Sequence, residues 1–226
     1  MNAALLIFST MRIVNFSESS SIIGQYLAEL RDVSIQKDRM RFRENIRRIS
    51  VCMAYEISKT LAYKKTQVQT PLALSHAEIL NEQPVIALVL RAGLAMHSGF
   101  LEVFDGADNC FISAYRDEGS VDEITAHIEY LASPNLEGRT VILVDPMLAT
   151  GSSLVGGFAA LLKNGKPKKL HVACIVAAPE GIAELQNKMP EIDTLWIAAI
   201  DSHLNEHAYI VPGLGDAGDL AYGTKM

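Results

Sequence analysis

The chain has only three cysteines among its 226 residues, an odd number of widely spaced thiols that does not suggest a disulfide framework. Two of them, Cys110 and Cys174, lie in apolar, strand-like runs, where we expect buried thiols in a reducing compartment. No apolar run approaches the roughly 18 residues of a membrane span. The apolar run at 3–8 is short and has no basic residue before it, unlike a signal peptide. These absences predict a cytoplasmic protein with no membrane partner.

An excess of positive charge is also missing, since the net charge is −6 and the pI is about 5.5. Such a chain has no general attraction for nucleic acid, so any anionic ligand must be bound locally. The basic segment at 37–48 could be an RNA-binding face. We interpret it instead as a solvated helix face with internal ion pairs to Glu44, and we expect no nucleic-acid partner.

What is present is typical of a globular protein, with 49% hydrophobic and 20% charged residues. We predict one domain over residues 16–226 and an N-terminal extension over residues 1–15 that need not be ordered. Apolar residues at helical spacing predict one helix after the serine cluster 19–21. They predict a second, longer helix whose apolar stripe runs from Phe42 to Leu61.

From residue 84 the pattern changes to short apolar runs of strand length, each typical of a strand buried on both faces. A helix-compatible segment at 151–165 separates two of these runs. The alternation predicts an α/β fold with a mostly parallel sheet flanked by helices. The predicted strands are 84–90, 110–115, 140–145, 170–177 and 194–200.

The junction "TVILVDPMLATGSSLVGG" at 140–157 carries the strongest functional signal. A buried strand brings Asp145 to its carboxyl end, and a loop with three hydroxyl residues then leads into a helix. Ligands bind at such ends in open α/β sheets, and a helix N-terminus suits a phosphate. Because sugar hydroxyls donate hydrogen bonds to a carboxylate, Asp145 beside this loop predicts a ribose 5-phosphate site. The alternative is an ordinary βα turn with a solvated Asp145.

Two other motifs are interpreted more plainly. Gly213, Gly215 and Gly218 have the spacing G-x-G-x-x-G, but no βαβ unit and no acidic residue about 20 positions later can follow them here. The segment "HLNEH" at 203–207 matches a zinc pattern, H-x-x-E-H, that requires a long helix. We predict that it lies between a strand and a turn, and we expect neither a dinucleotide nor a zinc site.

"VDPMLATGSS" resembles the phosphoribosyl-pyrophosphate (PRPP) loop of type I phosphoribosyltransferases, and Pro146 after the acid resembles the uracil phosphoribosyltransferase family in particular. The resemblance extends over about residues 16–226, through "LRDVSIQKDRMRFRE" (30–44), "LRAGLAM" (90–96), "YRDE" (115–118), "VAAPEGI" (176–182), "LNEHAYIVPGLGDAGD" (204–219) and "YGT" (222–224). It implies a type I-like fold with N-terminal helices and a C-terminal base-binding segment. It also implies that uracil and PRPP give UMP and pyrophosphate, a step of pyrimidine salvage.

The resemblance further implies the role of each site residue. Asp145 and Arg116 are expected to be catalytic, Mg²⁺ is held mainly by PRPP with no protein ligand, and we expect a homo-oligomer. The uracil-binding residues are expected to be Ile210, Gly215, Asp216 and Ala217, mostly through the main chain. PRPP binding is assigned to Arg91, Arg116, Asp145, Pro146, Met147, Leu148, Ala149, Thr150, Gly151, Ser152, Ser153 and Asp216.

This chain departs from the family pattern at three positions. Ser152 stands where the family usually has a second glycine, and Leu220 and Tyr222 stand where it has arginine and phenylalanine. We expect Ser152 to preserve the loop, whereas Leu220 removes a basic residue that could contact pyrophosphate. A different function remains open at this point, a nucleotide-sensing regulator that keeps the PRPP fold, is catalytically weak, and binds RNA or a protein partner.

Overall fold

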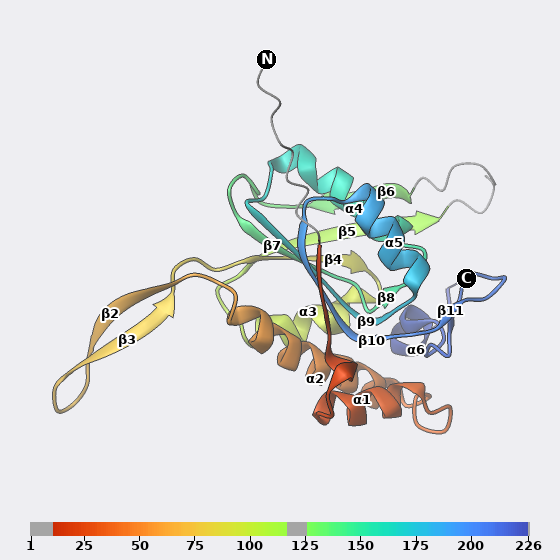
Figure 1. The fold of residues 1–226 in the computed structure, drawn as a ribbon, viewed down its shortest axis with the longest axis horizontal. Coiled ribbons are helices and arrows are strands. Elements are labelled where there is room, and N and C mark those ends of the chain that lie inside the picture. The colour runs from red at the N-terminus through yellow and green to blue at the C-terminus, as the bar shows by residue number, and fades with distance from the viewer. Residues whose placement is uncertain (1–10, 117–125, 226) are drawn as a thin grey trace, which may run out of the picture.

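A computed structural model describes residues 11–116 and 126–225, with the backbone alone described at 114–116 and 126–128. Its centre is an eight-stranded sheet in the spatial order β1-β10-β9-β7-β4-β5-β6, with β8 also paired to β9 (Figure 1). The pairs are parallel except for the antiparallel pair of β5 and β6. The strands are β1 (Arg12–Asn15), β4 (Val85–Leu90), β5 (Asp108–Arg116), β6 (Ala126–Ala132), β7 (Thr140–Val144), β8 (Met147–Leu148), β9 (Lys169–Ala177) and β10 (Ile192–Ile200).

Helices cover both faces of the sheet, which confirms the predicted α/β fold. In Figure 1, α1, α2 and α3 lie below the sheet, and α4 and α5 lie above it. The helices are α1 (Ile22–Arg31), α2 (Arg39–Ser58), α3 (Gly93–Leu101), α4 (Ser152–Leu161), α5 (Pro179–Lys188) and α6 (Ala217–Tyr222), with 3₁₀ turns η1 (Phe16–Glu18) and η2 (Leu162–Asn164).

The central strands are apolar throughout because each of their faces contributes to a different core. Ile142 and Val144 of β7 pack in one cluster with α1, α2 and α3, whereas Val141 and Leu143 pack in the other with α4 and α5. Successive side chains of a strand point to opposite faces, so a strand between two helical layers is mostly apolar, with few polar residues such as His171. Burial on both faces fixes the strands and therefore the loops that follow them.

The second predicted helix is α2, and its sequence explains both its start and its packing. The carboxylate of Asp38 accepts hydrogen bonds from the first turn, at 3.0 and 3.1 Å, which is an N-cap. The predicted stripe from Phe42 is buried, but the helix ends before Leu61. On the basic face, Arg47 pairs with Glu44 at 2.8 Å, as predicted, and also with Glu102.

Several strands were not predicted, including one at the edge of the main sheet and two outside it. Residues 12–15, which the sequence analysis placed in the N-terminal extension, form β1 and pair with β10 at the edge of the sheet. Between α2 and β4, the antiparallel strands β2 (Tyr63–Gln69) and β3 (Leu74–Leu80) form an arm that projects from the body (Figure 1). Both arm strands are exposed along most of their length, so they lack the alternating pattern that identifies a half-buried strand.

No helix in the described ranges combines the length and apolar character needed to cross a bilayer.

Candidate functional site

The carboxyl ends of adjacent parallel strands gather the predicted residues at one edge of the sheet. Arg91 follows β4 and Asp145 follows β7, and these two strands pair directly. Arg116 is the last residue of β5, the neighbour of β4 on its other side; its side chain lies outside the described part of the structure. A Cβ built on Gly93 would lie 3.2 Å from the carbonyl oxygen of Val144, so the turn after β4 touches the end of β7. This edge is where an open α/β sheet binds ligands.

The loop that Asp145 begins is fixed to β9 by main-chain hydrogen bonds. The carbonyl oxygen of Pro146 accepts two bonds from successive N–H groups of β9, at 3.0 Å each. The N–H of Ala178 donates to the carbonyl of Leu148 at 2.9 Å, and Met147 and Leu148 themselves form β8. The loop is therefore an extension of the sheet, which gives it the rigidity that a binding loop requires.

The loop then turns into α4 and encloses a hollow. Gly151 has φ of +84°, in the left-handed region, and α4 begins directly after it with no side-chain cap. The hydroxyls of Thr150 and Ser152 lie 2.8 Å apart, so Ser152 fits where a glycine was expected. The first-turn N–H groups and the helix dipole give this hollow the chemistry of an anion site. It is lined by Asp145, Met147, Ala149, Thr150, Gly151, Ser152, Ser153 and Leu154.

Asp145 is 9% exposed, and its Oδ1 accepts a hydrogen bond from the N–H of Met147 at 3.1 Å. This bond orients the carboxylate at the mouth of the loop. Cys174 of β9 lies near it, and burial, followed by the charge of Asp145, raises the pKa of that thiol well above its ordinary value. A thiol with a raised pKa is a poor nucleophile at neutral pH, which gives Cys174 the character of a packing residue.

Arg91, predicted to bind pyrophosphate, is held against the C-terminal helix. Its Nη2 pairs with Asp219 Oδ1 at 2.9 Å, and its Nη1 donates to the carbonyl oxygen of Gly223 at 3.0 Å. The side chain keeps 35% of its exposure, so the guanidinium borders solvent at the sheet edge. The contact with Asp219 was not predicted from the sequence.

The C-terminal segment bends sharply, and the bend explains why it contains glycines. Gly213 and Gly215 have φ of +58° and +91°, which favour glycine, and the Val211–Pro212 peptide bond is cis. The six-residue helix that follows, α6, begins after Asp216, whose carboxylate accepts from the N–H of Asp219 at 2.9 Å. The segment is a bent main chain beside Arg91, because a Cβ built on Gly218 would lie 3.8 Å from the Arg91 guanidinium.

The other two predicted base-binding residues flank this bend. Ile210 is 4% exposed and lies on β12 (Ile210–Val211), which pairs with β11 (His203–Leu204), and Ala217 is 1% exposed. The side chains of Ile210 and Ala217 are therefore packed inside the protein, whereas Gly215 and Asp216 between them are exposed.

The departures at 220 and 222 are explained by packing. Leu220 and Tyr222 both lie against the core cluster that includes α1, α2 and α3. A Cβ built on Gly215 would meet Leu220 at 3.5 Å, and the Arg43 guanidinium lies 6.0 Å from the centre of the Tyr222 ring. Position 220 therefore provides an apolar contact under the bend in place of a charge.

Sequence reasoning missed several residues that fix the site from behind. Arg31 and Asp201 form an ion pair that contacts Gly213, and the amide of Gln36 reaches the carbonyl of Leu214 at 3.1 Å. Gly181 lies directly under the loop at 145–151. The motifs "LRDVSIQ" and "VAAPEGI" contain three of these residues, but no pattern around them indicates a role.

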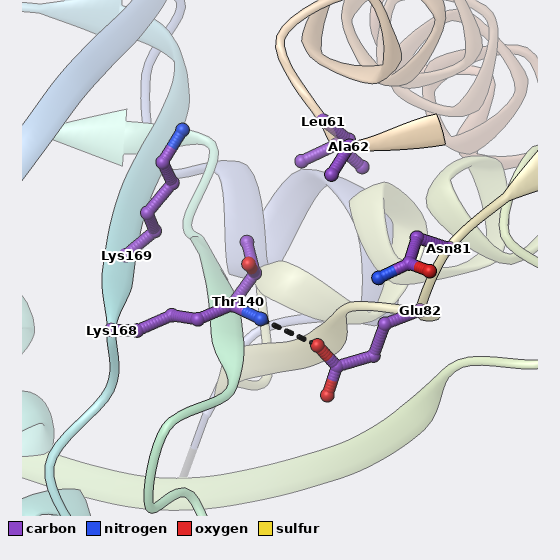
Figure 2. Close-up of a pocket in the computed structure, with 7 residues that line it drawn as sticks. All are labelled: Leu61, Ala62, Asn81, Glu82, Thr140, Lys168 and Lys169. Atoms are coloured by element: carbon purple, nitrogen blue, oxygen red, sulfur yellow. Dashed lines mark hydrogen bonds and ion pairs between the residues drawn. The ribbon is translucent and has the colours of Figure 1, made fainter. Parts of the chain in front are cut away.

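A second hollow lies at the opposite, amino edge of the sheet (Figure 2). There Lys168 pairs with Glu82 at 2.6 Å, and Arg139 pairs with the same Glu82 at 2.9 Å. The two cations lower the pKa of Glu82, the hydrogen bond from Lys168 being the larger cause. This network ties the strand starts together and is remote from the loop at 145–151. The lining residues are Leu61, Ala62, Asn81, Glu82, Thr140, Lys168 and Lys169.

The "HLNEH" segment forms β11 and the turn after it, which confirms that it lies on no helix. Over residues 11–116 and 126–225, no three His, Cys, Asp or Glu side chains gather in a way that could hold a metal ion.

A mostly parallel sheet with the loop at 145–151 after a central strand, and a bent C-terminal segment at the same edge, is the architecture expected of a phosphoribosyltransferase. The family model for uracil phosphoribosyltransferase matches residues 17–224, and the chain belongs to this family. It is 46% identical over 216 residues to the uracil phosphoribosyltransferase of Porphyromonas gingivalis, which covers 96% of this chain and 100% of that one. It is 39% identical over 205 residues to that of Dictyoglomus turgidum, at 90% and 96% coverage.

A solved structure, that of the AQ2163 protein from Aquifex aeolicus, has the same fold. Its TM-score is 0.83 at 30% identity, covering 95% of this chain and 99% of that one.

Proposed function

We propose that this enzyme transfers the 5-phosphoribosyl group of PRPP to uracil and releases UMP and pyrophosphate. The observation that carries the proposal is the family match over residues 17–224 together with a phosphate loop and a bent main-chain segment at one edge of the sheet. Nothing in the fold or the comparisons favours the alternative of a catalytically weak regulator. Arginines of the basic face that an RNA-binding regulator would need are engaged in ion pairs, Arg41 with Glu29 and Arg47 with Glu44.

The phosphate loop is proposed to hold the ribose 5-phosphate of PRPP. The phosphate lies at the start of α4, beside main-chain N–H groups and near the hydroxyl residues Thr150, Ser152 and Ser153 that line the hollow. Asp145 accepts hydrogen bonds from the ribose hydroxyls. As the bond from C1 to pyrophosphate breaks, positive charge develops on the sugar, and the carboxylate stabilises it. Uracil N1 attacks C1 from the opposite face, so the configuration inverts and the N1 proton is released.

Arg91 and Arg116 are proposed to bind the pyrophosphate. Arginine presents a planar fork of donors that matches phosphate oxygens, and both residues stand at strand ends, where the backbone is fixed. Mg²⁺ is proposed as the cofactor, carried by PRPP itself, and it neutralises charge on the leaving pyrophosphate. Among the residues that line the hollow at the loop, Asp145 carries the carboxylate that could contact a Mg²⁺ ion bound to PRPP.

Uracil is proposed to be read by the main chain of Ile210, Gly215 and Ala217, with Asp216 reaching toward PRPP. The pairing edge of uracil presents an acceptor, a donor and an acceptor, which a bent main chain can match with N–H, C=O and N–H. Cytosine differs at two of these positions, and each mismatch leaves a buried group unpaired at a cost of about 1–3 kcal/mol. Such costs reject the wrong base strongly.

A homo-oligomer in the cytoplasm is the proposed state of the enzyme in pyrimidine salvage. The arm of β2 and β3 supports an oligomer, because it extends away from the body (Figure 1) and carries exposed apolar side chains. Leu72 at its tip is 96% exposed, and Leu74 is 64% exposed. Such apolar surface is typical of a contact with another chain. Light scattering should give a mass of at least twice the 24.7 kDa of the chain.

A steady-state assay tests the reaction. Purified protein with PRPP, Mg²⁺ and uracil should form UMP and pyrophosphate in equal amounts, and cytosine in place of uracil should give at least about 10²-fold less product. Absence of UMP formation by folded protein would overturn the proposed function.

A further inference from the structure

An ion pair on the far side of the C-terminal bend connects α1 to the end of β10. Arg31 is the last residue of α1, and Asp201 directly follows β10. The guanidinium meets the carboxylate through two bonds, Nη1 to Oδ2 at 2.9 Å and Nη2 to Oδ1 at 2.7 Å. The Asp201 side chain is 5% exposed and that of Arg31 is 22% exposed. A two-bond, nearly buried pair of this kind holds both side chains in one orientation.

The same two side chains hold both polar groups of one residue, Gly213. Its N–H donates to Asp201 Oδ2 at 2.9 Å, and its carbonyl oxygen accepts from Arg31 Nη1 at 3.1 Å. Only glycine fits at position 213, because a Cβ there would clash with the carbonyl oxygen of Ile210. One position later, the carbonyl of Leu214 accepts from Gln36 at 3.1 Å. The chain is thus fixed at 213 and 214, immediately before the residues at 215–217.

We propose that Arg31 and Asp201 are positioning residues for uracil recognition, acting through Gly213. The inference rests on the proposed function. A base that is read by main-chain groups offers the protein no side chain to adjust, so its affinity depends on where the backbone is held. Misplacement by about 1 Å costs reactions of oriented groups on the order of 10²-fold. The ion pair supplies the constraint from two elements that carry none of the proposed PRPP-binding residues.

The test is to replace each partner and separate uracil use from PRPP binding. Arg31→Ala and Asp201→Ala should each raise the KM for uracil at saturating PRPP by about tenfold or more, in line with a displaced binding group. The dissociation constant for PRPP, from calorimetry with Mg²⁺, should change by less than about threefold. Arg31→Lys, which keeps the charge and one donor, should recover part of the loss.

A matched control and a double variant distinguish positioning from general stability. Arg41→Ala removes the ion pair with Glu29 at 2.9 Å between α2 and α1, and it should leave the KM for uracil unchanged. The variant that combines Arg31→Ala with Asp201→Ala should be scarcely worse than either single variant, because the two residues act as one unit. Thermal melts confirm that each variant is folded.

Two results would overturn the inference while UMP formation by the parent upholds the proposed function. The first is a parent-like KM for uracil in folded Arg31→Ala, and the second is an equal loss of uracil and PRPP affinity. If the parent itself formed no UMP, the proposed function would fail. Amide hydrogen exchange would still test whether Arg31 and Asp201 hold the main chain at Gly213 in place. Exchange at 213–217 should be faster in Arg31→Ala than in Arg41→Ala, and equal rates would refute it.

Discussion

Gly181→Ala should impair catalysis far more than it impairs folding, although Gly181 is assigned no contact with substrate. Gly181 is in the first turn of α5, directly beneath the phosphate loop. A Cβ at this position would lie 2.2 Å from the carbonyl oxygen of Ala149 and 2.9 Å from Leu148. Since Cβ contacts below 3.0 Å essentially never occur, the helix and the loop must separate by most of an ångström.

The loop is expected to move at Ala149, which lies just past the hydrogen bonds that hold residues 146–148, because the helix is anchored in the core. Ile182 and Leu185 anchor α5 in the core, whereas Ala149 is part of the partly exposed loop. Overpacking costs about 1–3 kcal/mol of stability, and replacing a helical glycine by alanine returns about 0.5–1 kcal/mol. The free energy of unfolding should therefore fall by roughly 0–2.5 kcal/mol. A displaced phosphate loop should reduce kcat/KM for PRPP by about 10²-fold.

The assay compares Gly181→Ala with Gly24→Ala, which makes the same substitution in α1. A Cβ on Gly24 would meet nothing within 4 Å, so this control should be stabilised by about 0.5–1 kcal/mol and keep parent activity. UMP formation gives kcat/KM for PRPP, and urea unfolding gives the stability of both variants. Activity of Gly181→Ala within about threefold of the parent would refute the steric argument, since a loss on the order of 10²-fold is expected.

Three further outcomes are expected. Asp145→Asn keeps the side-chain oxygen that accepts from Met147 but loses the charge, so kcat should fall by about 10²-fold or more with the fold intact; near-normal turnover would exclude the assigned role. Gly215→Val adds a β-branched side chain at φ of +91° and should harm uracil-dependent turnover more than PRPP binding, measured by calorimetry; equal losses would mean that the bend does not read the base. Burial lowers the pKa of His171 from 6.5 to about 4. As the pH falls, His171 therefore takes up a proton in the unfolded chain before it does so in the folded chain. The stability that depends on a neutral His171 is complete above pH 6.5, and about 3 kcal/mol of it is lost as the pH falls toward 4. In His171→Gln, the free energy of unfolding measured with urea should fall less between pH 6.5 and pH 4 than in the parent. An equal fall in both proteins would mean that His171 does not cause it.

The sequence determined the elements whose cause is local. Apolar runs such as 140–145 and 170–177 form strands that are buried on both faces. Because both faces are buried, nearly all residues of such a run are apolar, and the sequence alone shows this. The strand–loop–helix junction at 140–157 was likewise predictable, since an acid, a glycine and hydroxyl residues lie within nine positions between an apolar run and a helix-compatible segment. The resemblance to the family was carried by such short, contiguous motifs.

Only the tertiary structure decided which distant residues serve the site. Arg31 and Asp201 are 170 positions apart, and the residues next to them in sequence do not indicate that the two form an ion pair at Gly213. Position 181 requires glycine because a Cβ there would clash with the carbonyl oxygen of Ala149. Leucine is tolerated at position 220 because its side chain packs against the core. The exposed arm has no periodic pattern because neither of its faces is buried in the chain by itself. Patterns in sequence record the burial and turns of one segment, whereas contacts between segments depend on how the sheet brings its strand ends together.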